Sequence, residues 1–282
     1  MSATERHVAR LDYAAGAQSA TNFARALYDL TAGFGKVWVW STLAWQDIKL
    51  RYRGSVLGPL WLTLTIVIMV GSMGFLYAKL FHMDVKTYLP FLTVGMVFWQ
   101  MIQSTITDSC SCFVQSAAIV QQVRMPFSIH IYRMICRNLI VLAHTVVVIP
   151  IVLVIFHRPI SWEIVLLLPA LALLSLNALF LGIILGMISA RYRDVPPIVQ
   201  NLVQVLFFIT PIFWAPEQLG RWAAVSQFNP LFAAVDILRS PIIGPHFVPY
   251  MSWLVMTGVT VAIGAVALPM FSRYRARIPY WV

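Results

Sequence analysis

Six long apolar runs occupy most of this 282-residue chain, and they constrain its fold more than any motif does. Each run has about the 17–25 residues that a helix needs to cross a hydrocarbon core of about 30 Å. The chain is 60% hydrophobic and only 11% charged, which excludes a water-soluble domain. The sequence therefore predicts an all-α integral membrane protein with six transmembrane helices, at residues 56–80, 88–106, 139–156, 162–189, 195–214 and 247–271.

The basic residues distinguish the two sides of the predicted bundle. With the N-terminus in the cytoplasm, fifteen of the 20 Lys and Arg residues fall in cytoplasmic segments, and the other five are Lys79, Lys86, Arg158, Arg221 and Arg239. Cytoplasmic loops carry the excess of Lys and Arg in membrane proteins, so we expect both termini to be cytoplasmic. This topology signal, together with attraction to anionic headgroups, explains the net charge of +10 better than nucleic-acid binding does.

Two segments of different composition precede the first predicted span. Residues 1–35 are predicted to form a cytoplasmic N-terminal tail. In residues 36–55, Trp38, Trp45 and Tyr52 share one stripe at helical spacing, and such rings prefer the headgroup level. We therefore expect an in-plane amphipathic helix here, followed by an elbow at Gly54 into the six-span domain of residues 56–282. The alternative is a weakly hydrophobic extension of the first span.

Two loops have an unusual composition. The loop after the second span contains a short amphipathic segment that ends at Pro126, which predicts a short cytoplasmic helix between spans 2 and 3. Residues 214–246 are too apolar for a solvated loop and too broken for a full crossing. They predict two re-entrant helices that enter from the outer face, with the pair Asn229 and Pro230 as the turn between them.

Few ionisable residues lie close to the predicted spans. Arg133 and Arg137 lie one helical turn apart and are expected to extend to the headgroups. Asp47 and Arg51 are four residues apart and could pair on the wet side of the in-plane helix. Asp108 is the one acidic residue near a span, at its inner end.

Two further features concern contacts between spans. His144 lies deeper in the third span, and we expect it to be neutral and hydrogen-bonded between helices. Gly182 and Gly186 form a G-x-x-x-G pattern in the fourth span, which allows two helix backbones to approach closely.

The sequence carries no recognised catalytic or metal-binding motif: G-x-x-x-x-G-K-[ST], H-E-x-x-H, G-x-S-x-G and paired C-x-x-C are all missing. A proton- or sodium-coupled carrier usually buries carboxylates near the midplane, because coupling needs a group that gains and loses charge there. Such carboxylates are scarce here. We therefore expect no catalytic residue, no metal and no cofactor in this chain, and an energy source on a separate polypeptide.

The elbow resembles that of permease subunits of type-two ABC exporters, in particular those that export O-antigen and capsule polysaccharides. The stretch that carries the resemblance is DIKLRYRGSVLGPLW at residues 47–61. Further matching stretches are IVQQVRMP at 119–126, RYRD at 191–194, the segment 229–239 and SRYRARIPYW at 272–281. These matches cover the chain from about Lys36 to its end, in the family's order.

The resemblance implies a bacterial inner-membrane transport subunit rather than an enzyme. The family works as a dimer of permeases with two nucleotide-binding ATPase subunits, which bind the ATP and Mg. Its substrate is a polysaccharide attached to undecaprenyl diphosphate, which moves outward between the two permeases. The resemblance also implies that residues 214–246 are two outer gate helices. It places the ATPase-coupling helix at Ala117, Ala118, Ile119, Val120, Gln121, Gln122, Val123 and Arg124.

Two sets of side chains are candidates for contact with such a substrate. Sugar rings have flat C–H faces, so an aromatic-lined channel could hold them weakly and let them slide. The candidate lining residues are Trp61, Phe98, Trp99, Phe207, Phe208, Phe213 and Trp214; the alternative is that these rings pack or face lipid. Lys49, Arg51 and Arg53 are candidates for binding the lipid diphosphate or headgroups, and a role in topology alone is the alternative.

Two other functions stay open from the sequence. The same fold could export a drug, haem or a lipid. An integral-membrane transferase that acts on lipid-linked sugars would instead need a carboxylate or histidine pair facing one aqueous side, and the sequence offers no clear pair. Neither the composition and length of the glycan nor the choice between O-antigen and capsule can be predicted from these residues.

Overall fold

The structure, a computed structural model, describes residues 21–58, 60–80, 83–123, 125–159, 161–216, 218, 226, 228–243 and 249–282. These residues form helices joined by short loops, and no strand occurs among them. The predicted all-α class is confirmed. Five helical segments are long and apolar enough to cross a membrane: Leu60–Leu80, Val85–Ser111, Ser128–Ile155, Trp162–Arg191 and Tyr250–Trp281.

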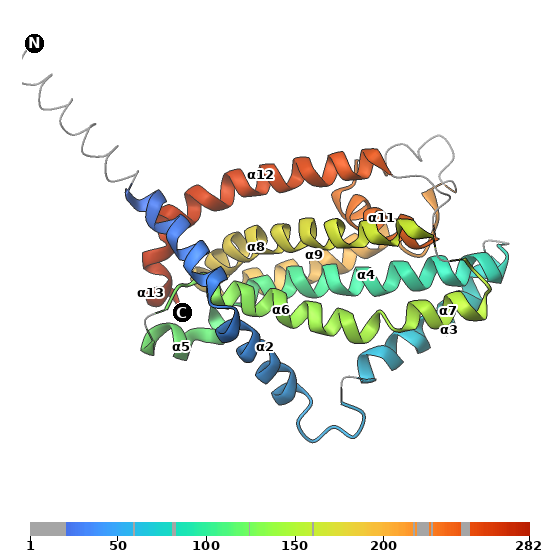
Figure 1. The fold of residues 1–282 in the computed structure, drawn as a ribbon, viewed down its shortest axis with the longest axis horizontal. Coiled ribbons are helices and arrows are strands. Elements are labelled where there is room, and N and C mark those ends of the chain that lie inside the picture. Colours follow the sequence, from blue (N-terminus) through green and yellow to red (C-terminus); the bar gives the residue numbers. More distant parts are fainter. Residues whose placement is uncertain are drawn as a thin grey trace, which may run out of the picture.

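The long helices run side by side as a bundle (Figure 1). Helix α4 (Val85–Ser111) lies at its centre and packs against α3 (Leu60–Leu80), α6 (Ser128–Thr145) and α8 (Leu167–Arg191). Helix α12 (Tyr250–Tyr274) packs on α8. Four short elements extend these helices. Helix α7 (Val148–Ile155) continues α6, the 3-10 turn η2 (Trp162–Leu166) precedes α8, and η4 (Arg275–Arg277) and α13 (Ile278–Trp281) follow α12.

The bundle has two distinct ends. Helices α5 (Ala117–Gln122) and α13 lie at one end with the C-terminus, whereas α7 and α11 (Pro230–Ile243) lie at the other (Figure 1). We call them the α5 end and the α11 end. The short helix predicted between the second and third spans is therefore present, as α5.

The expected fifth span is shorter than predicted. Helix α9 (Val195–Ile209) has 15 residues, so it is about 22 Å long and does not cross a 30 Å core by itself. It ends because Thr210 adopts an extended conformation before Pro211, and the residue before a proline disfavours the helical region. Residues 210–215 continue as an irregular segment.

Small residues let the central helices approach closely, as predicted for the G-x-x-x-G pair. A Cβ atom at Gly182 would lie 2.6 Å from Cγ2 of Ile131 on α6. At Gly186 it would lie 2.7 Å from Sγ of Cys112, just after α4. The two glycines thus bring α8 into contact with both neighbours. His144 differs from our expectation, because its Nδ1 atom lies 2.8 Å from the carbonyl oxygen of Ile140 on its own helix.

The predicted tail is partly helical. Residues 21–35 form a helix directly before α2 (Val37–Arg51). The carboxylate of Asp29 accepts the backbone N–H groups of Phe127, at 3.1 Å, and Ser128, at 3.0 Å, where α6 begins. An acceptor at a helix N-terminus satisfies donors that have no partner within the helix. Residues 21–35 of the predicted tail are therefore helical and contact the start of α6, while their cytoplasmic location stays a prediction; residues 1–20 lie outside the described part of the chain.

Helix α2 packs against α6 and then turns into α3. It buries Ala44 and Ile48 and leaves the rings of Trp38 and Trp45 exposed. The expected elbow is present: Gly54 has a φ of 82° and Gly58 a φ of 54°, a region that glycine enters without steric cost. That α2 lies in the plane of a membrane stays a prediction.

One helix is described within the segment predicted to hold two re-entrant helices, and its re-entrant character stays a prediction. It is α11, and its first turn is capped by Asn229, whose side-chain oxygen accepts the N–H of Leu231 at 2.9 Å. The first expected helix falls mostly on residues 217, 219–225 and 227, which lie outside the described residues. Helix α11 packs on α4, α8 and α12, so an element from late in the chain is inserted among the long helices.

Candidate functional site

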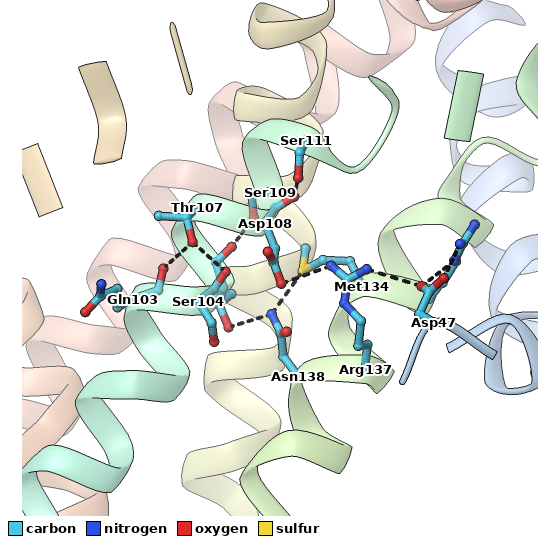
Figure 2. Close-up of polar contacts among 12 residues, drawn as sticks. Asp47, Gln103, Ser104, Thr107, Asp108, Ser109, Ser111, Met134, Arg137 and Asn138 are labelled. Carbon is cyan, nitrogen blue, oxygen red and sulfur yellow. Dashed lines mark hydrogen bonds and ion pairs between the residues drawn. The ribbon is translucent and has the colours of Figure 1, made fainter. Parts of the chain in front are cut away.

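Four charged side chains form a network near the α5 end. Figure 2 shows three of them, Asp47, Asp108 and Arg137. Arg133 on α6 pairs with Asp47 on α2 through two nitrogens: Nε donates to Oδ2 at 2.7 Å, and Nη2 bonds to Oδ1. Such two-point contacts are the strongest class of side-chain hydrogen bond. One helical turn along α6, Arg137 donates from Nη1 to the same carboxylate at 3.2 Å.

Arg137 also reaches the central helix. Its Nη2 atom lies 2.9 Å from Oδ2 of Asp108 on α4. The Arg137 side chain is only 6% exposed, so it lies between two carboxylates with little access to solvent. We call Asp47, Asp108, Arg133 and Arg137 the charge network; it holds two positive and two negative charges and joins α2, α4 and α6.

The charge network extends to the segment before α5. Nη1 of Arg133 lies 3.4 Å from Oγ of Ser116, the last residue of the 3-10 turn η1 (Val114–Ser116). Deeper in the bundle, Nδ2 of Asn138 lies 3.5 Å from Oγ1 of Thr105. A single polar path therefore connects α2, α6 and α4 with the turn that leads into α5.

The charge network corrects two expectations. Arg133 and Arg137 were expected to extend to the headgroups, and the structure gives them carboxylate partners on α2 and α4. Asp47 pairs with these arginines rather than with Arg51. Sequence reasoning missed the contacts because Asp47 and Arg133 lie 86 residues apart. The available signal was Asp108, an acidic residue at the inner end of the second predicted span.

The candidate coupling segment is mostly exposed. Among residues 117–123, only Val120 is buried, and the Nε2 atom of Gln121 donates to the backbone oxygen of Val282 at 2.7 Å. Arg124 lies outside the described residues. Beside α5 is a cavity of about 510 Å³ that is lined by residues including Asp29, Lys36 and Arg275. The chain thus presents a short helix and an adjoining hollow on one face of the α5 end.

The three candidate cations for a lipid diphosphate lie close together in the chain, and all are exposed. Lys49 and Arg51 occupy the last turn of α2, and Arg53 follows in the elbow. The ammonium group of Lys49 lies 5.7 Å from the centre of the Trp45 ring. None of the three forms an ion pair with a carboxylate in the described part of the chain.

Most of the candidate channel rings gather into one aromatic cluster towards the α11 end. The ring of Phe207 lies 5.7 Å from Trp99, 5.3 Å from Phe208 and 5.5 Å from Phe213. The Trp214 ring nitrogen donates to the backbone oxygen of Phe208 at 3.2 Å. We call Trp99, Phe207, Phe208, Phe213 and Trp214 the aromatic cluster.

Two candidate rings lie elsewhere. Phe98 is 1% exposed and belongs to the packed core of α4. Trp61 lies in the first turn of α3 and is 50% exposed. Neither forms a ring contact with the aromatic cluster, so the structure separates these two residues from the other five.

Sequence analysis missed the side chains that hold the irregular segment 210–215. The Tyr88 hydroxyl donates to the backbone oxygen of Phe213 at 2.5 Å. Arg239 on α11 donates from Nη1 to Pro211 at 3.2 Å and from Nη2 to Ile212 at 3.1 Å. The signal was Pro211 itself, because a helix that ends inside an apolar run leaves carbonyl groups that need donors.

Comparison with known proteins assigns the family. The model of the ABC-2 type transporter family matches residues 39–243, well over half of the chain. The chain belongs to the ABC-2 type transporter family. The matched range begins in α2 and ends with α11, so it contains the charge network, α5 and the aromatic cluster.

Curated relatives of this ABC-2 family chain match most of its length. Two proteins from Klebsiella pneumoniae, both named O-antigen export system permease protein RfbA, are 24% and 26% identical to it. Each alignment covers 82% of this chain and 90% of the relative. A protein of the same name from Myxococcus xanthus is 27% identical over 71% of this chain and 76% of the relative.

Proposed function

We propose that this chain is the transmembrane subunit of an ATP-driven exporter. Its substrate in this proposal is a polysaccharide of the O-antigen or capsule type, attached to undecaprenyl diphosphate and moved out across the bacterial inner membrane. Membership of the ABC-2 family supports this, as do the printed names of the relatives and the elbow residues 47–61. ATP and Mg bind to a separate nucleotide-binding subunit.

The transporter in this proposal contains two copies of the chain and two ATPase subunits. Each copy makes six crossings, of which the fifth consists of α9 and the segment 210–215 together. Both termini and the α5 end face the cytoplasm, in accord with the excess of Lys and Arg in those segments. Residues 214–246, including α11, form the outer gate of the channel between the two copies.

The observation that carries the proposal is the charge network. It ties α2 and α4 to α6 and reaches Ser116, one residue before α5. In this proposal α5 docks on the ATPase, so a displacement of α5 reaches three helices through charged contacts. Separating a buried ion pair would leave each charge without a partner and away from water, which is costly. The helices that such pairs join therefore move together.

The aromatic cluster and the three exposed cations define the path of the substrate. We assign the cluster to the glycan, because rings bind the C–H faces of sugars without deep pockets. We assign Lys49, Arg51 and Arg53 to the diphosphate at the inner leaflet. Replacing both Arg51 and Arg53 with glutamine should lower glycan export at least about tenfold, since a charge-assisted hydrogen bond contributes about 1.5–3 kcal/mol.

The effect is measured as the amount of glycan on the cell surface, in cells that contain equal amounts of the inserted protein. Arg158→Gln is the control, because it removes an exposed arginine at the other end of the bundle. Unchanged export with the Arg51 and Arg53 double variant would remove the diphosphate assignment.

Reconstitution tests the function as a whole. The purified chain and its ATPase are placed in liposomes that contain undecaprenyl-diphosphate-linked glycan, and transfer of glycan between leaflets is followed. We expect transfer only with ATP and only with both proteins present. ATP-driven movement of a drug, haem or a phospholipid but not of the glycan would favour the alternative cargo. A covalent change in the glycan by this chain alone would favour a transferase.

A further inference from the structure

One buried arginine at the α11 end has no role in the function described so far. Arg239 is 4% exposed, and it forms no ion pair with a carboxylate of the described residues. Its guanidinium carbon lies 4.0 Å from the centre of the Phe91 ring. Asp236, on the same helix, interacts with Arg239 electrostatically but does not form an ion pair with it. A buried cation that no carboxylate contacts directly is costly, and ionisable groups at such positions in membrane proteins are usually functional.

The guanidinium holds the backbone of another segment. Its two terminal nitrogens donate to the carbonyl oxygens of Pro211 and Ile212, directly after α9 has ended. The next carbonyl, of Phe213, accepts the Tyr88 hydroxyl. Three successive carbonyls that lack helical partners are therefore bonded to side chains from α11 and α4, and the position of 210–215 depends on those donors.

Gly95 on α4 has no side chain, and this leaves the space that the guanidinium and the carbonyl of Ile212 occupy. A Cβ atom at Gly95 would lie 2.2 Å from Nη2 of Arg239 and 3.0 Å from the backbone oxygen of Ile212. Any other residue at Gly95 would push apart the two groups that bond there. We call Arg239, Phe91, Gly95 and the carbonyls of Pro211 and Ile212 the Arg239 clasp.

Helix α11 has free space at its opposite end. A cavity of about 230 Å³ lies among α4, α6, α8, α11 and α12, and the first turns of α11 line it with Pro230, Leu231 and Ala234. Tightly packed interfaces resist displacement, whereas a helix beside a void meets less resistance. The clasp thus secures α11 to segment 210–215 at one point, while the cavity leaves room for the helix to shift once that point is released.

We propose that Arg239 is a positioning residue that keeps α11 and segment 210–215 in one arrangement, and that export depends on this clasp. Loss of the clasp frees the segment that carries Phe213 and Trp214, so the aromatic cluster no longer has a defined geometry. The dependence of export rests on the proposed function, whereas the positioning itself does not.

A buried reporter tests the positioning. Ile212 is 0% exposed, so Ile212→Cys reports opening of the segment to a hydrophilic maleimide on purified protein in nanodiscs. The chain without this substitution gives the background from its three native cysteines. Arg239→Met and Gly95→Ala should each raise the labelling rate about tenfold or more, because each disrupts charge-assisted hydrogen bonds. Arg239→Lys should give an intermediate labelling rate, because lysine keeps the charge but lacks the two planar guanidinium nitrogens that bond both carbonyls.

Matched controls separate the clasp from general loosening. Gly258→Ala adds the same methyl group where no atom lies within 4 Å, and Arg158→Met removes an exposed arginine whose Nη2 donates to Thr87 at 2.7 Å. Both should label at the parent rate. Should Arg239→Met fail to reach the membrane, Gly95→Ala and Arg239→Lys provide the same comparison. Unchanged labelling in the clasp variants would overturn the positioning role.

Export is measured separately in cells that carry the same variants without the reporter. We expect Arg239→Met and Gly95→Ala to lose surface glycan while both controls keep it. Faster labelling with normal glycan export would overturn the dependence of export on the clasp. If the parent chain moves no glycan at all, the proposed function fails, yet the labelling comparison still decides the positioning role because it requires neither substrate nor ATPase.

Discussion

Arg137 shows how a single side chain can connect three helices. It lies 3.2 Å from the carboxylate of Asp47 and 2.9 Å from that of Asp108, and Arg133 supplies the second positive charge. Removing two balanced charges from water costs several kcal/mol per ion, which good geometry offsets only while both partners are present. The network therefore specifies which helices meet more than it adds net stability.

Removing one member of the Arg137–Asp108 pair should therefore lower the free energy of unfolding more than removing both members. Arg137→Met leaves Asp108 without its ion-pair partner and should lower the free energy of unfolding by about 3–5 kcal/mol. The double variant Arg137→Met with Asp108→Asn should recover part of that loss. Thermal unfolding of the purified protein, at fixed detergent concentration, measures both effects. Equal losses in the single and double variants would show that the Arg137–Asp108 pair is not coupled.

Contacts of this kind could not be predicted from the chain alone. Periodicity places Arg133 and Arg137 on one face of their helix, but it does not say which residue lies opposite. We therefore expected the commoner arrangement, in which a long cation near a helix end extends to the headgroups. We paired Asp47 with Arg51, because the sequence alone assigns contacts only between residues three or four apart on one helix.

At the scale of helices, the apolar runs predicted four elements closely and two only in part; one of the two is the run 139–156, whose helical segment begins earlier, at Ser128. The run 162–189 corresponds to the segment Trp162–Arg191, since a long uninterrupted apolar stretch has few alternatives to a helix. The run 195–214 contains Pro211, and the helix there ends at Ile209. Apolar composition predicts burial in a membrane, but backbone hydrogen bonding decides where the helix ends.

The helix of residues 21–35 offers an element-scale prediction. Asp29 accepts two backbone N–H groups at the start of α6 and lies 3.9 Å from Nη1 of Arg275. Asp29→Ala removes this cap and should destabilise the contact by about 0.5–2 kcal/mol. Limited proteolysis should then cut residues 21–36 faster than in the parent chain.

Asp29→Asn is the graded control for that experiment. It keeps one side-chain oxygen as an acceptor but loses the negative charge, so its cleavage rate should lie between those of the parent chain and Asp29→Ala. Equal cleavage of all three proteins would mean that the helix is held by its apolar contacts, which bury Ala26 and Leu30.

For the molecule as a whole, the number of crossings decides which face each functional group meets. Among the residues that the structure describes, five helical segments are long enough to cross by themselves, and α9 is not. With an odd number of crossings the termini would lie on opposite sides, so α11 or α5 would face the wrong compartment for the proposed function. Residues 210–215 add up to about 20 Å if extended, which is enough to complete a crossing that α9 begins.

Three exposed positions report the crossings in order: His157 before η2, Tyr192 between α8 and α9, and Phe228 before α11. Each is replaced singly by cysteine and labelled with an impermeant maleimide in intact cells and in inverted vesicles. We expect His157→Cys and Phe228→Cys to react in cells and Tyr192→Cys only in vesicles, because carbonyls 211–213 have the protein donors that a crossing requires. Reaction of Phe228→Cys only in vesicles would place α11 on the same side as Tyr192, reduce the crossings to five, and remove the outer gate from the proposed mechanism.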